Sequence, residues 1–113
     1  MASLIYRTIQ KYRNAFNYRG QIAPIIETGS QLLPLQGVLN KLAGTTGLGE
    51  DDAANVWLRK THPTAPYLSM LGALNYLNGT YGHGGLGLNL VCCELAGVRG
   101  FYATQALNIL ANA

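Results

Sequence analysis

Apolar residues recur along most of this chain at the spacing of one helical face. No run of residues alternates convincingly between apolar and polar positions, as a half-buried strand would. The pattern therefore predicts an all-α fold, with several short helices joined by loops rich in glycine and proline. No internal repeat is evident at this level, and 113 residues are read as a single domain, residues 1–113.

The first predicted element is a cationic amphipathic helix over residues 1–20, which Gly20 would end. Arg7 and Lys11 fall on the side opposite its apolar stripe, and the first 26 residues contain no acid. Such a helix suits an uncleaved targeting segment, a membrane surface or ordinary packing on a domain. Its stripe supplies the first candidates for a partner interface, which are Ile5, Ile9, Tyr12 and Phe16.

Two short helices are expected in the middle of the chain. Residues 35–43 form the first, and residues 44–49, rich in glycine and threonine, read as a loop. The second covers about residues 50–60, because three acids open it and Arg59 and Lys60 close it, an order that complements the helix dipole. Val56, Trp57 and Ala53 are expected to form its apolar side.

Residues 64–113 read as a charge-poor helical segment. A helix capped by Thr64, with Pro66 in its first turn, should run to a stop at Gly79. After a loop, helix is expected again from about Leu88 to Gly97 or Gly100, and over 101–111. The predicted apolar face of the first of these helices adds five partner-interface candidates: Tyr67, Met70, Leu71, Leu74 and Leu77.

Charge is distributed unevenly along the chain. Charged residues make up 12% of the sequence, about half the usual share of roughly 25%. Only Glu94 and Arg99 carry a formal charge after Thr61. These two are expected to pair with each other or with charges of a partner, and they complete the partner-interface candidates. A surface so poor in charge predicts an arrangement that is extended or that depends on other subunits to cover it.

No residue pattern makes a strong case for catalysis. Gly82-His83-Gly84-Gly85-Leu86-Gly87 matches the dinucleotide fingerprint G-x-G-x-x-G, but a helical pattern precedes it and no acid lies about 20 residues on. His62, His83, Cys92 and Cys93 lack the spacing of a zinc site. We therefore expect a protein that is not an enzyme, with no catalytic or metal site, no cofactor and no small-molecule substrate.

The net charge of the chain and the length of its apolar segments bear on nucleic acid and membrane partners. A net charge of +3 is too mild for a typical nucleic-acid binder, so no nucleic acid is expected as a partner. A spanning helix needs about 20 mostly apolar residues. Residues 66–78 are too few, and residues 86–110 contain both charges of the C-terminal half. Contact with membrane lipid remains open.

Short length, charge depletion, glycine-rich helices and an acid-free cationic N-terminus together resemble the small supernumerary subunits of mitochondrial inner-membrane complexes, including algal ATP synthases. The resemblance implies a structural accessory subunit, in an ATP synthase or respiratory complex, that packs against other protein subunits. It also implies a location in the mitochondrial inner membrane or at its surface. The alternative is a self-assembling structural protein of a virion or filament, which would also hide an uncharged surface.

Overall fold

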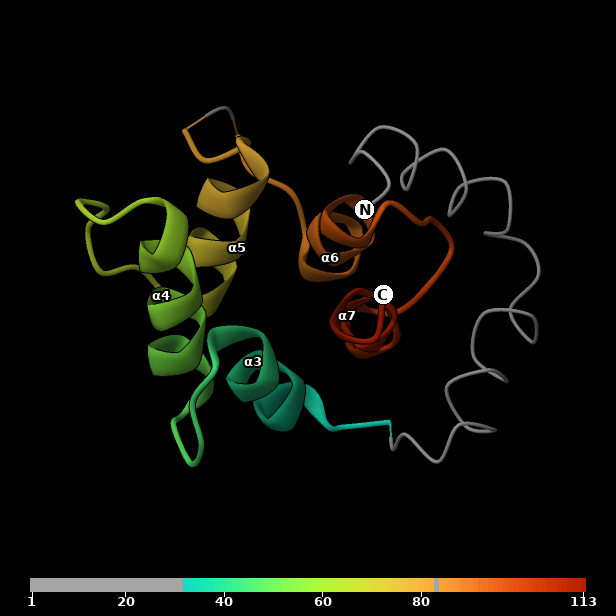
Figure 1. Ribbon diagram of the computed structural model, residues 1–113. Coiled ribbons are helices and arrows are strands. Elements are labelled where there is room, and N and C mark those ends of the chain that lie inside the picture. The colour runs from blue at the N-terminus through green and yellow to red at the C-terminus, as the bar shows by residue number, and fades with distance from the viewer. Residues whose placement is uncertain (1–31, 83) are drawn as a thin grey trace.

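The computed structural model describes residues 32–82 and 84–113, and in these ranges the protein contains five α-helices and no strand (Figure 1). The predicted short helices over 35–43 and 50–60 are confirmed, as is helix after Leu88 and within 101–111. The predicted helix over residues 1–20 lies outside the described residues. The five helices are α3 (Leu35–Ala43), α4 (Glu50–Thr61), α5 (Met70–Asn78), α6 (Leu88–Ala96) and α7 (Ala103–Ala111).

The start predicted for the helix before Gly79 is wrong. Helix α5 begins at Met70, and Ser69 caps it by accepting a 3.2 Å hydrogen bond from the Gly72 amide. The stretch before it is not helical, because Leu68 bonds through its backbone N–H and C=O to the side chain of Asn55 in α4. A tertiary contact thus replaces the local cap that Thr64 offers in the sequence.

The linkers between helices run back along the helix they leave. Helices α3, α5 and α6 each end at a glycine with positive φ, such as Gly44 at 75°. The linker after α3 then returns far enough for Gln36, the second residue of that helix, to donate a 2.8 Å hydrogen bond to the carbonyl of Leu48. The linker therefore returns to the start of α3, and α4 begins beside the first turn of that helix.

The five helices are copies of one short pattern, so the expectation of no internal repeat is wrong. In every helix the fourth and fifth residues have no exposed surface and the sixth is Asn or Cys. The second residue before each helix, here called the pre-helix residue, is Leu or Phe. The buried pairs are Val38 and Leu39, Ala53 and Ala54, Ala73 and Leu74, Val91 and Cys92, and Ala106 and Leu107.

The helices form a closed ring around one core. Each helix packs on the next along the chain, and α7 packs on α3 to complete the circuit. Figure 1 shows α3, α4 and α5 on one side of the ring and α6 with α7 on the other. The described residues are thus a compact globule and not the extended arrangement that charge depletion predicts. The repeated buried pairs supply a core that composition alone does not reveal.

Candidate interaction surface

Each helix is tied to its neighbour by a polar side chain inside the ring. Asn40 of α3 donates a 2.9 Å hydrogen bond to the carbonyl of the pre-helix residue Leu48, whose amide donates to Asn40 Oδ1 over 3.1 Å. The same Nδ2 also donates to the Gln36 carbonyl, one turn back in the helix. Both donors and the acceptor of this buried amide are therefore used. We call this arrangement a clamp.

Three further asparagines make the same clamp. Asn55 holds Leu68 through bonds of 2.6 and 2.9 Å, and Asn75 holds Leu86 through bonds of 3.0 and 2.7 Å. Asn108 of α7 holds Leu33, which precedes α3, through bonds of 2.9 and 2.8 Å. Because a buried amide is costly to leave unpaired, these clamps fix the register of each linker against its helix.

Helix α6 uses a cysteine where the other helices use asparagine. The Cys93 thiol donates to the carbonyl of the pre-helix residue Phe101 over 3.2 Å. Burial raises the pKa of this thiol, and burial together with the neighbouring thiol raises the pKa of Cys92 to about 12. Since the thiolate is the reactive form, both cysteines are structural groups and poor nucleophiles at neutral pH.

Large apolar side chains are exposed on the charge-poor part of the ring. Leu90 on α6 is 52% exposed and Tyr102, just before α7, is 72% exposed. Tyr67, Leu71 and Tyr81 are exposed as well. Among residues 32–82 and 84–113, five of the six large exposed apolar side chains therefore follow Thr61, and the sixth is Leu32. Single exposed apolar residues are ordinary, whereas several of them in a region with two formal charges favour contact with another surface.

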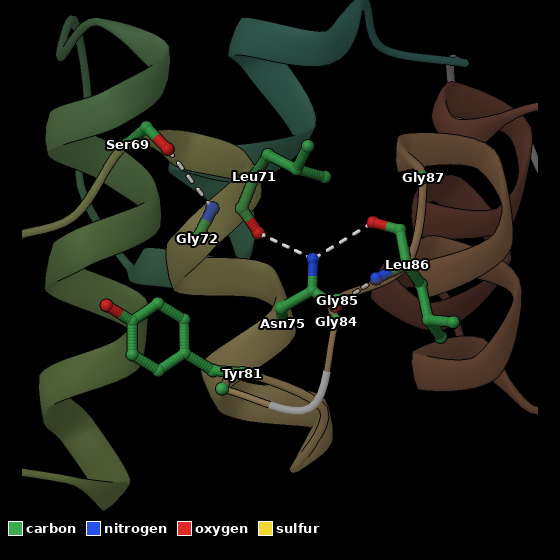
Figure 2. A pocket seen from close by; sticks show the side chains of 10 residues that line it. Ser69, Leu71, Gly72, Asn75, Tyr81, Gly84, Gly85, Leu86 and Gly87 are labelled. Carbon is green, nitrogen blue, oxygen red and sulfur yellow. Dashed lines mark hydrogen bonds between the residues drawn. The ribbon is translucent and has the colours of Figure 1, made fainter.

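An open hollow lies between α5 and the linker that leads to α6 (Figure 2). It measures about 480 Å³, and none of the residues that line it is charged. Figure 2 shows Asn75 bridging Leu71 and Leu86 across its wall through its amide nitrogen. Because that amide is already paired, the hollow offers apolar contact and glycine backbone, together with the hydroxyl groups of Ser69 and Tyr81.

The structure divides the predicted apolar face of residues 67–77 between the inside and the outside of the ring. Leu74 is fully buried in the chain's own core, which removes it from any surface open to a partner. Met70 and Leu77 are half-buried against the same core. Tyr67 and Leu71 are exposed and remain candidates. The expected apolar side of α4 shifts too: Ala53 is buried as expected, but Val56 and Trp57 are only half-buried.

Tyr67 is also anchored by polar contacts. Its hydroxyl donates a 2.5 Å hydrogen bond to Asp52, and the Arg59 guanidinium lies 5.8 Å from its ring centroid. The hydrogen bond to Asp52, with a small contribution from burial, raises the pKa of the Tyr67 hydroxyl. These contacts hold an exposed aromatic ring in one orientation at the first turn of α4.

The remaining interface candidates are placed as follows. Glu94 and Arg99 are both exposed, and Glu94 accepts a 3.0 Å hydrogen bond from Asn78 of α5. Ile5, Ile9, Tyr12 and Phe16 lie outside the described residues.

Of the positions considered for metal or nucleotide chemistry, Cys92 and Cys93 are buried in α6, and His83 lies outside the described residues. Among residues 32–82 and 84–113 no three His, Cys, Asp or Glu side chains come together as a metal site would require. The glycines between 82 and 87 join two helices, whereas the dinucleotide fingerprint needs a strand before it. In the same part of the chain, no helix combines the length and apolar character that crossing a membrane requires.

Neither the clamps nor the most exposed apolar positions are predicted from the sequence. A signal for the clamps is present, because Leu-Asn-x-Leu occurs at residues 39–42, 74–77 and 107–110. In the first two copies Gly-Thr follows, and Thr45 and Thr80 each donate to the clamp oxygen, over 2.8 and 2.7 Å. The exposure of Leu90 and Tyr102 depends on how α6 and α7 sit in the ring, and no local pattern encodes it.

Comparisons of the chain with protein-family models, with curated proteins and with solved structures find no match to any of them. Interpretation of this surface therefore rests on its own geometry.

Proposed function

We propose that this protein is a structural subunit that acts by packing against neighbouring protein subunits. The observation that carries the proposal is the group of exposed apolar side chains on and around α5, α6 and α7, in a half of the chain with two formal charges. The clamps support it, because they hold these side chains on a ring whose linkers are fixed by buried hydrogen bonds.

Burial of these side chains against a partner would favour docking. Full burial of a large apolar side chain contributes about 1.5–3 kcal/mol, and a few well-placed anchors carry most of the affinity of an interface. Leu90 and Tyr102 are the most exposed anchors that α6 and the segment before α7 offer. Glycine backbone in the hollow between α5 and the linker to α6 would let a partner approach closely.

For the host assembly we propose a mitochondrial membrane complex, an ATP synthase or respiratory complex, at the inner membrane or its surface. The support for this location is the cationic, acid-free sequence of residues 1–26 together with the charge-poor composition. A self-assembling virion or filament protein is the alternative, and it makes the same use of an uncharged surface.

Fractionation separates these proposals. A subunit of a membrane complex should migrate with a large assembly on a native gel after extraction in mild detergent. A virion or filament protein should assemble from the purified chain alone. A chain that stays monomeric and stable without detergent, and that joins no larger assembly in extracts of its source, would overturn the structural role itself.

The surface is tested by one substitution and its control. Leu90→Glu places a charge at the exposed apolar position of α6 and should reduce incorporation into the assembly at least tenfold. Thr46→Glu adds the same charge at an exposed position in the linker after α3 and should incorporate normally. Both variants should unfold at the urea concentration of the parent chain, because neither position is buried. Equal incorporation of the two variants would contradict the proposed surface.

A further inference from the structure

One of the four asparagine clamps joins parts of the chain that no linker connects. Asn40, Asn55 and Asn75 each hold the pre-helix residue of the helix that follows, so the linker keeps the two partners together. Asn108 instead holds Leu33, which lies 75 residues earlier. We call this contact the seam. No linker joins its two sides directly, so Asn108 and Leu33 could come from two different chains.

The ring divides naturally into two parts. Helix α6 packs more extensively on α7 than on α5, and α4 packs extensively on both α3 and α5. The pair α6–α7 therefore contacts the unit α3–α5 through two smaller surfaces, the seam and the α5–α6 contact. The one covalent connection between the two parts is the linker after α5. Its described glycines at 79, 82, 84 and 85 have φ between 67° and 90°, a region that other residues rarely adopt.

We propose that two copies of this chain exchange their α6–α7 pairs, so that each ring is completed by the α6–α7 pair of the other copy. A second copy of this chain can complete the seam. Asn108 needs a backbone N–H and a backbone C=O as partners, and Leu107 needs an apolar face to pack against. The chain itself presents these features at Leu33 and at Val38 and Leu39. All contacts of the closed ring recur in the exchanged dimer, between chains instead of within one.

The balance between the two forms depends on concentration and on the linker. Because closed and exchanged rings make the same clamps and bury the same core, the difference lies in the entropy of association and in the conformation of the linker. The exchange is independent of the host assembly. It uses the seam and the α5–α6 contact and not the exposed side chains of Leu90 and Tyr102.

Cross-linking between singly substituted chains tests the exchange directly. At the seam Lys41 Nζ lies 3.3 Å from Asn112 Oδ1, and at the α5–α6 contact Asn78 Nδ2 lies 3.0 Å from Glu94 Oε1. Lys41→Cys chains are incubated at high concentration with Asn112→Cys chains, and Asn78→Cys with Glu94→Cys. A short bis-maleimide is then added, and mass spectrometry locates the cross-links. The matched control is Asp52→Cys with Tyr67→Cys, a contact within the unit α3–α5.

We expect cross-linked dimers from both pairs that bridge the two parts, and at least tenfold fewer from the control pair. Cross-links at the seam alone would mean that α3 and not α6–α7 is exchanged, and would overturn the proposal. So would a chain that stays monomeric in size-exclusion chromatography at the highest soluble concentration, or a dimer that forms neither cross-link. Deletion of Gly84 and Gly85 shortens the linker and should raise the dimer fraction at least tenfold at equal concentration; an unchanged fraction would contradict the role of the linker.

Discussion

Asn108 in α7 holds Leu33 ahead of α3 with hydrogen bonds of 2.9 and 2.8 Å, although 75 residues separate them in the chain. The bonds join the same atoms as those by which Asn40 holds Leu48 eight residues later. The contact that closes the ring between α7 and α3 is therefore the same asparagine clamp that joins α3 to α4, α4 to α5 and α5 to α6. Loss of this one clamp should affect the whole ring.

Asn108→Ala should lower the free energy of unfolding by about 2–4 kcal/mol. The substitution leaves the N–H and C=O of Leu33 without their partner at a part-buried site, and each unpaired buried group costs about 1–3 kcal/mol. Urea denaturation followed by circular dichroism measures the change. Asn78→Ala is the matched control, because Asn78 bonds to the exposed Glu94, and it should cost less than about 1 kcal/mol. Similar losses in the two variants would argue against the clamp.

Cys93→Asn should be tolerated and should stabilise the chain by up to about 1 kcal/mol. Asparagine at this position would place an amide donor, which is stronger than a thiol, beside the Phe101 carbonyl, as in the four asparagine clamps. Cys93→Leu removes the polar group altogether and should destabilise. The midpoints of urea unfolding of the two variants are compared. An asparagine variant that is less stable than the leucine variant would show that α6 does not accept the clamp found in the other helices.

Stability should fall as the pH rises from about 9 to about 12. The pKa of Cys92 is raised from 9.0 to about 12 in the folded chain, so in this range the unfolded chain loses a proton that the folded chain keeps. The unfolded state is then favoured by up to about 1.4 kcal/mol per pH unit, and below pH 9 the effect is absent. Cys92→Ala should flatten this part of the unfolding profile. A parallel decline in both chains would assign the pH dependence to other groups.

Two glycine-to-alanine substitutions should change the stability of the fold in opposite directions. Gly79 ends α5 with φ at +78°, so Gly79→Ala should cost about 1 kcal/mol although no atom lies within 4 Å of the added Cβ. Gly37 lies within α3 and has ordinary van der Waals space, so Gly37→Ala should stabilise by about 0.5–1 kcal/mol. Thermal unfolding of both variants measures the difference. Equal shifts would contradict the left-handed cap.

The sequence by itself determined where most helices of the described region lie. Acids before bases set the ends of α4, and glycines set the ends of α3, α5 and α6, because these effects act within one or two turns of the chain. The start of α5 escaped prediction, since it depends on Leu68 being held by Asn55, 13 residues away.

The tertiary structure alone decided what those helices build and what they expose. Leu71 and Leu74 share one predicted face, yet Leu71 is exposed and Leu74 is fully buried, because burial depends on which neighbour each turn meets. The sequence contains Leu-Asn-x-Leu three times, but it does not say that Asn108 reaches back to Leu33. Hydrogen bonds between distant segments closed the ring, and a pattern read along the chain carries no information about which distant backbone will occupy each clamp.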